Sequence, residues 1–116
     1  MTQNKGARFN DSFNPLKVVE EVYQTYDWAE FTIATGTTDY DVAANQSAMF
    51  SNVKNAWLAI IHVDQDVTIR FNDTTLPAIN HLSALSPWEW RNVFKITNIY
   101  ITNNSGSTVN VKILLV

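Results

Sequence analysis

The chain has 116 residues, 46% of them hydrophobic, and a formal net charge of −3. This length and composition suffice for one hydrophobic core, so we expect a single domain. The 8 Lys and Arg residues are scattered, which argues against nucleic-acid binding through phosphate neutralisation. Without cysteine, neither disulfides nor zinc-thiolate sites are possible, and no apolar stretch is long enough to predict a membrane span.

Residues 1–15 are polar apart from Phe9 and Phe13, and their Asn and Asp residues discourage regular structure. Two interpretations stay open for this segment. It is either a disordered terminus or an extended N-terminal arm that lies on a neighbouring subunit, with Phe9 and Phe13 as anchors. We adopt the arm as the prediction, so that residues 16–116 form the folded domain.

Residues 16–34 fit two patterns of periodicity. Their valines and tyrosines up to residue 26 fit one face of a helix, whereas residues 23–33 mix aromatic residues with threonine as strands do. We favour β structure, because Phe31 and Ile33 lead directly into a turn at residues 35–38.

The middle of the chain contains the clearest alternation of apolar and polar residues. A short strand is predicted at residues 40–44, and a longer connection follows. Residues 57–63 and 67–72 flank Asp64-Gln65-Asp66, which predicts a hairpin with one core face and one solvent face.

Residues 78–82 are predicted to form a short edge strand. Beyond them, Trp88 and Trp90 lie two residues apart on an extended segment, so their side chains project to the same side. Three roles stay open for this pair: closing one end of the core, anchoring an interface, or stacking on a sugar. Trp28 and Trp57 lie among other apolar residues and are predicted to be in the core.

Residues 93–116 form two β-branched and aromatic runs around the turn at residues 103–107, which predicts a second hairpin. The alternating apolar residues stand at even positions before residues 97–98 and at odd positions after them, which predicts a β-bulge or bend there. Apolar residues would then lie on both faces of a strand at residues 94–102. One face would serve the core and the other a partner, with Tyr100 as a predicted interface residue.

Together these patterns predict seven or eight short strands and no repeated helical segment. Such a pattern is typical of an all-β, single-domain β-sandwich. We expect a jelly-roll-like sandwich with the extended N-terminal arm attached to it.

The residues that could carry chemistry are few. His62, Asp64 and Asp66 have the spacing of three ligands at a strand end, but aspartates also form turns, and we favour the turn. Asp39 and Asp41 could join a calcium site, yet no EF-hand spacing is present. We therefore predict no catalytic, cofactor or metal-binding residues and a protein that is not an enzyme.

Three segments carry a resemblance to a known class of proteins. Residues 31–42, residues 67–72 and residues 99–107 with the closing strand resemble small all-β virion proteins of tailed bacteriophages. The likeness covers residues 28–116 and contains no catalytic or metal motif. It implies head decoration, head-tail connection or tail proteins, which are not enzymes, form symmetric oligomers and use terminal arms to hold their neighbours.

From this resemblance we predict a capsid decoration (cement) protein, a homotrimer that binds the major capsid protein on the virion surface after synthesis in the host cytoplasm. Alternatives are a tail, adaptor or receptor-binding component, and a carbohydrate-binding module. No nucleic-acid or membrane partner is expected. The predicted interface residues are Phe9, Phe13, Trp88, Trp90 and Tyr100.

Overall fold

The computed structural model describes residues 25–116, apart from the side chains of residues 92–94. The predicted arm at residues 1–15, with Phe9 and Phe13, and residues 16–24 lie outside the described residues. The regular elements of the described part are β1 Asp27–Ile33, β2 Thr37–Asp41, α2 Val42–Asn45, β3 Ala56–Val63, β4 Val67–Phe71, β5 Ile79–His81, the 3-10 helix η2 Ser83–Leu85, β6 Trp88–Ile96, β7 Ile99–Asn103 and β8 Val109–Leu115.

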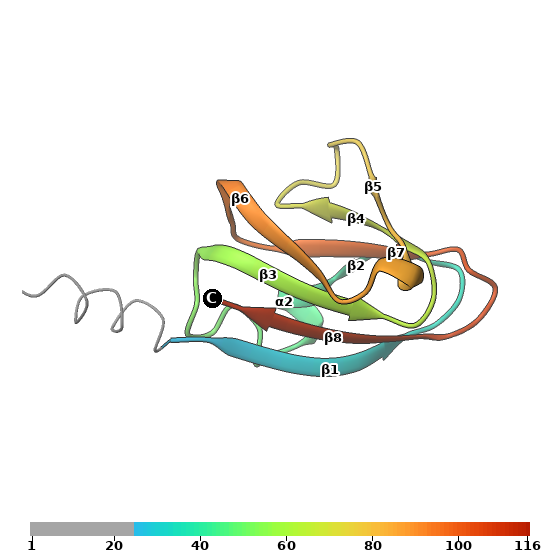
Figure 1. The fold of residues 1–116 in the computed structure, drawn as a ribbon, viewed down its shortest axis with the longest axis horizontal. Coiled ribbons are helices and arrows are strands. Elements are labelled where there is room, and N and C mark those ends of the chain that lie inside the picture. Colours follow the sequence, from blue (N-terminus) through green and yellow to red (C-terminus); the bar gives the residue numbers. More distant parts are fainter. Residues whose placement is uncertain (1–24) are drawn as a thin grey trace, which may run out of the picture.

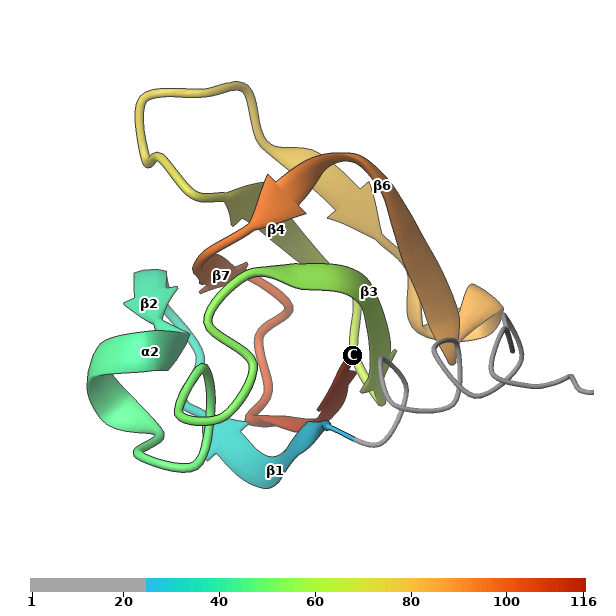
Figure 2. The ribbon, with the colours of Figure 1, turned by 90° about the vertical axis from the view of Figure 1, so that its left-hand side faces the viewer.

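The strands form two four-stranded antiparallel sheets. The first sheet has the order β1-β8-β3-β6, and the second has the order β2-β7-β4-β5 (Figure 1). The sheets form two layers (Figure 2), and buried side chains of both layers make one hydrophobic core. The prediction of an all-β fold is therefore confirmed as a two-sheet, sandwich-like arrangement.

Consecutive strands almost always lie in different sheets. Within residues 25–116, only β4 and β5 follow one another in the chain and also pair. β5 is the last strand in the order of the second sheet, which confirms the edge strand predicted at residues 78–82. Both predicted hairpins are wrong, because β3 and β4 lie in different sheets and so do β7 and β8. A short polar turn between two β segments connects stacked sheets as readily as it closes a hairpin.

The apolar residues before and after residues 97–98 alternate in opposite phase because the chain crosses from one sheet to the other at this point. β6 ends at Ile96 and β7 begins at Ile99, and both side chains are buried in the common core although the strands belong to different sheets. The prediction of one continuous strand at residues 94–102 is therefore wrong, whereas residues 97–98, where a bulge or bend was predicted, are the connection between β6 and β7. Asn72 stabilises the crossing, since its Oδ1 accepts a 2.7 Å hydrogen bond from the backbone N–H of Thr97.

The first two strands follow the expected alternation only in part. Every second residue of β1 is buried, which confirms β structure for this part of residues 16–34. The strand predicted at residues 40–44 ends earlier, because Asp41 is the N-cap of α2. Its Oδ1 accepts a 3.0 Å hydrogen bond from the backbone N–H of Ala44, as Asp favours at this position.

Asp27 anchors the start of β1. Its side chain is only 3% exposed, and its carboxylate accepts hydrogen bonds from the backbone N–H groups of Asn52 and Val53, at 3.1 and 2.9 Å, and from the side chains of Ser51 and Asn52. Burial raises the pKa of this carboxyl, but the four hydrogen-bonded groups outweigh burial and hold the pKa below its ordinary value of 3.8. The edge of the first sheet is thus fixed to the loop before β3.

Candidate functional site

The outer face of the first sheet is apolar over the part formed by the ends of β1, β3 and β8, where polar residues would be expected. In antiparallel sheets with one wet face, polar residues alternate with core residues. On β3, the inward residues Ala59 and Ile61 are fully buried, yet the outward neighbours Leu58 and Ile60 are also apolar and only half-buried. On β8, Leu114 repeats this pattern.

These outward residues lie side by side. In the strand register, Leu114 lies between Trp28 of β1 and Ile60 of β3. In the next row, Val116 exchanges backbone hydrogen bonds of 3.0 and 3.2 Å with Leu58. We define the apolar face as the side chains of Tyr26, Trp28, Leu58, Ile60, Leu114 and Val116.

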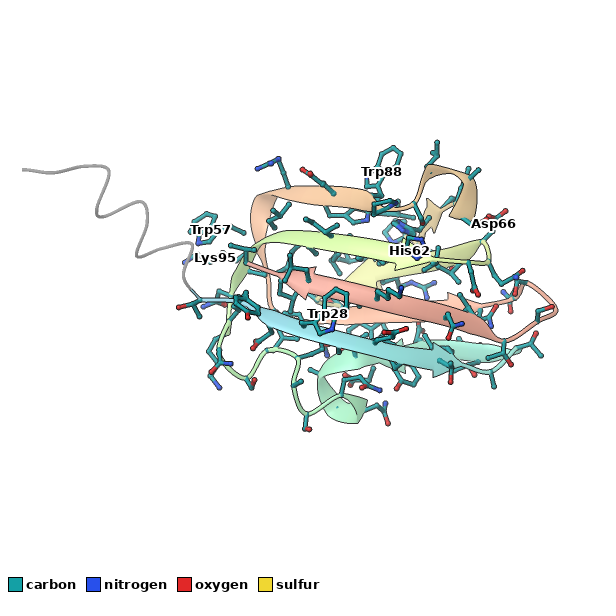
Figure 3. The ribbon with its side chains drawn as sticks, turned by 60° about the horizontal axis from the view of Figure 1, so that its bottom comes forward. Trp28, Trp57, His62, Asp66, Trp88 and Lys95 are labelled. Carbon is teal, nitrogen blue, oxygen red and sulfur yellow. The ribbon has the colours of Figure 1, made fainter. Side chains whose placement is uncertain are left out.

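The aromatic residues of this region are exposed. Trp28 is 50% exposed and Trp57, at the start of β3, is 55% exposed (Figure 3). The prediction that both tryptophans lie in the core is therefore wrong. Lys95 lies with its Nζ 5.5 Å from the centroid of the Trp57 ring, within the range of a cation–π contact.

A row of charged and polar residues borders the apolar face. Lys112 of β8 lies in register between Glu30 of β1 and His62 of β3. Within residues 25–116, neither Glu30 nor Lys112 forms an ion pair, whereas Arg91 and Glu89 of β6 pair at 3.1 Å. The apolar face is thus bordered by charges of both signs that are available to a partner.

Trp90, one of the two tryptophans predicted as interface residues, packs over one end of the hydrophobic core. Its ring packs edge-on against Phe71, with centroids 5.4 Å apart, and its Nε1 donates a 3.2 Å hydrogen bond to Nδ1 of His81. Since Trp90 can only donate, Nδ1 carries no proton and Nε2 of His81 donates to the carbonyl of Ile61 at 3.1 Å. This chain of contacts joins β5 of the second sheet to β3 and β6 of the first.

His81 is buried in its neutral form. Burial lowers the pKa of its imidazole below the ordinary value of 6.5, and the nearby His62 acts in the same direction, against the hydrogen bond to Ile61. Protonation of Nδ1 would place two donors against each other. His81 is therefore a structural link between the sheets that requires the neutral ring.

Trp88 lies at the surface with other apolar residues. Its ring is 39% exposed and 5.9 Å from the ring of Trp90. Between the end of β4 and the start of β6, the exposed large apolar residues are Leu76, Ile79, Leu82, Leu85 and Trp88. We call these five residues the edge cluster, because the segment that carries them contains the edge strand β5, and we treat them as a second set of candidate contact residues.

The outer face of the second sheet is polar. Thr68 lies in register between Asn80 and Thr102, and Arg70 lies opposite Tyr100. We define the polar face as these five side chains. Tyr100 is half-buried there, and its predicted role at an interface stays a prediction.

The acidic residues considered as metal ligands form separate local contacts. Oδ1 of Asp64 accepts a hydrogen bond from the backbone N–H of Asn110 at 2.8 Å, and Oδ1 of Asp66 accepts one from Ser83 at 2.9 Å. Within residues 25–116, no group of three or more His, Cys, Asp or Glu side chains could hold a metal ion.

The other acidic pair is also engaged. Asp39 pairs with Arg70 at 2.6 Å, and Asp41 caps α2 while accepting a 2.8 Å hydrogen bond from Nδ2 of Asn98. Both carboxylates thus have local structural partners, Asp39 within the second sheet and Asp41 between α2 and the residue before β7.

Sequence reasoning missed Leu58, Ile60 and Leu114 as surface residues. The signal was present, because the run of residues 56–63 is apolar except for His62, as in strands buried on both faces. A strand in a two-layer sandwich has only one face in the core. The excess apolar residues therefore identify an outer surface that a partner can cover.

Comparisons of this chain with protein-family models, curated proteins and solved structures gave no match. In the described part of the chain, neither helix has the length and apolar character needed to cross a membrane.

Proposed function

We propose that the chain is a non-enzymatic structural protein of a virus particle, which decorates the head of a tailed bacteriophage as a homotrimer and binds the major capsid protein. The observation that carries this proposal is the apolar face. Leu58 and Ile60 of β3 and Leu114 of β8 are apolar residues on the outward side of central strands, as in surfaces that are buried by assembly. The sequence resemblance supplies the class of particle.

The strand order supports a jelly roll. Jelly rolls contain eight strands in two sheets formed by two Greek keys, and they occur in viral capsid and lectin domains. The orders β1-β8-β3-β6 and β2-β7-β4-β5 bring the first and last strands together and alternate the sheets along the chain. This is the arrangement expected when a long hairpin folds over on itself.

A decoration protein needs one surface for sister subunits and another for the shell. We assign the apolar face to sister subunits, because Leu58, Ile60 and Leu114 lie on the central strands β3 and β8 of the first sheet. We assign the edge cluster, which includes Trp88, to the shell. The N-terminal arm at residues 1–15, with Phe9 and Phe13, extends the grip on the capsid.

Two measurements test the proposal. Light scattering should give three times the 13.2 kDa mass of the chain. The purified protein should also sediment with heads built from the major capsid protein of the same phage, and deletion of residues 1–15 should weaken this attachment while the domain stays folded. A monomer at high micromolar concentration would exclude the trimer, and absence from heads with attachment to tails would favour a tail or adaptor component.

A carbohydrate-binding module is the second candidate. It is favoured by the exposed ring of Trp88 beside Trp90 and by the occurrence of jelly rolls among lectins. Glycans should then quench tryptophan fluorescence, and Trp88→Ala should abolish the effect without unfolding. Trp28→Ala is the matched control, because Trp28 is as exposed but lies on the other surface.

A further inference from the structure

We propose that residues 16–23 of a neighbouring copy cover the apolar face. This inference rests on the proposed assembly role and names the part of the partner that makes the contact. Residues 16–23 lie outside the described residues, and their composition, their length and the place where the described chain begins support this contact.

The composition of the segment matches the surface. Five of its eight residues, Leu16, Val18, Val19, Val22 and Tyr23, are apolar. Of the six apolar side chains of the apolar face, Tyr26 and Trp28 are exposed and the other four are only half-buried within residues 25–116. Burial of apolar area on both partners is the main driving force for such a contact.

The charges are also complementary. The segment carries Glu20 and Glu21 beside its valines and one cation, Lys17. The border of the apolar face presents Lys112, which has no ion pair in the described chain, and Glu30 beside it. Contacts of Glu20 or Glu21 with Lys112, and of Lys17 with Glu30, would fix the register of the segment.

The length is sufficient. An extended segment of eight residues spans roughly 27 Å, whereas β1 and β3, with β8 between them, lie about 10 Å apart. The segment can therefore cross all three strands of the apolar face.

The local sequence favours a neighbouring copy over the same chain. Thr25 lines a pocket with Lys54, Asn55 and Val116 at the end of the first sheet, so the chain enters β1 from beyond that end. To cover its own sheet, the chain would have to reverse at Gln24-Thr25, although neither residue is a favoured turn former. A neighbouring copy has no such constraint.

Single cysteines test this arrangement, because the natural chain has none. Full-length Val19→Cys and Leu114→Cys chains are co-expressed and treated with a short bismaleimide. Since each chain has one cysteine, any link between positions 19 and 114 joins two chains. Thr68→Cys, on the polar face, is the matched control, and circular dichroism verifies the fold of each variant.

We expect at least a tenfold excess of the link from 19 to 114 over the link from 19 to 68. Equal yields would overturn the inference. It would also be overturned if the doubly substituted Val19→Cys/Leu114→Cys chain formed only an intrachain link. A trimer that forms the expected link but does not bind heads would retain this inference and reject the decoration role.

Discussion

The outer faces of the two sheets differ sharply, although both sheets have four strands and share one core. One end of the outer face of the first sheet carries the apolar face around Leu114, bordered by Glu30, His62 and Lys112, whereas the outer face of the second sheet is hydrogen-bonded and charged around Arg70. Folding requires only the inner faces to be apolar. The difference therefore separates residues needed for the fold from residues available for assembly.

The strongest test of this difference introduces the same charge on each face. Leu114→Asp should raise the dissociation constant of the oligomer at least 100-fold, about 2.8 kcal/mol, because a carboxylate would be buried in the contact. Thr68→Asp should leave the dissociation constant unchanged. Analytical ultracentrifugation measures both. Equal effects would remove the distinction between the faces.

A second test concerns the fold rather than the assembly. Asp27→Asn should lower the free energy of unfolding by about 2 kcal/mol or more, since the amide cannot accept all the hydrogen bonds now made to the buried carboxylate. Glu30→Gln, on the same strand but facing outward, is the control. Urea unfolding at pH 7 measures the free energy of unfolding of both variants.

The carboxyl of Asp27 also predicts acid sensitivity. Because its folded-state pKa lies below the ordinary 3.8, its stabilisation is complete above that value and is lost as the pH falls through the folded-state pKa. Asp27→Asn should lack this part of the acid dependence. If Asp27→Asn kept the full pH dependence of stability in acid, that dependence would come from other ionisable groups.

A third test uses the link between the sheets. His81 is neutral in the fold, so its stabilisation is present above the ordinary pKa of 6.5 and decreases as the pH falls below it. The melting temperature should be lower at pH 5 than at pH 7.5. His81→Gln should reduce this difference, and His62→Gln, at a half-buried outward position, should change it less.

The smallest effect is expected on the polar face. Asp39→Asn removes the ion pair with Arg70 but keeps a residue type that tolerates the positive φ of 49° at this position. Partly exposed ion pairs contribute roughly 0.2–1 kcal/mol. Thermal unfolding should show a slightly lower stability of Asp39→Asn than of the natural chain in low salt, and this difference should disappear in high salt. A loss above 2 kcal/mol would mean that the second sheet depends on this charge.

The strands could be predicted from the sequence, but their partners could not. Alternation identified β4, because period-2 burial is a local property. Pairing is not local, and the turn at residues 64–66 looks the same whether it closes a hairpin or crosses between layers. The parity change before Ile99 was the one local sign of a crossing.

The candidate site was predicted less well than the fold. Trp28 and Trp57 were assigned to the core because apolar neighbours surround them in the chain, but hydrophobicity alone does not distinguish a core from an uncovered outer face. Asp27 gave no signal, because the loop groups that bind its carboxylate are at least 24 residues away. Trp88 is 39% exposed, so its interface and sugar-stacking roles stay predictions, whereas Trp90 packs against Phe71 and closes the core.

The central position of β8 has a consequence for how the protein folds. β8 pairs with β1 on one side and β3 on the other, so Asp27 lies opposite Leu115. The first sheet cannot form until the last strand has been synthesised, and nearly every pairing joins residues distant in the chain. Such topologies fold slowly and expose unpaired strand edges while they wait. A nascent chain of this protein would therefore remain incompletely folded, and prone to association, until β8 has been synthesised.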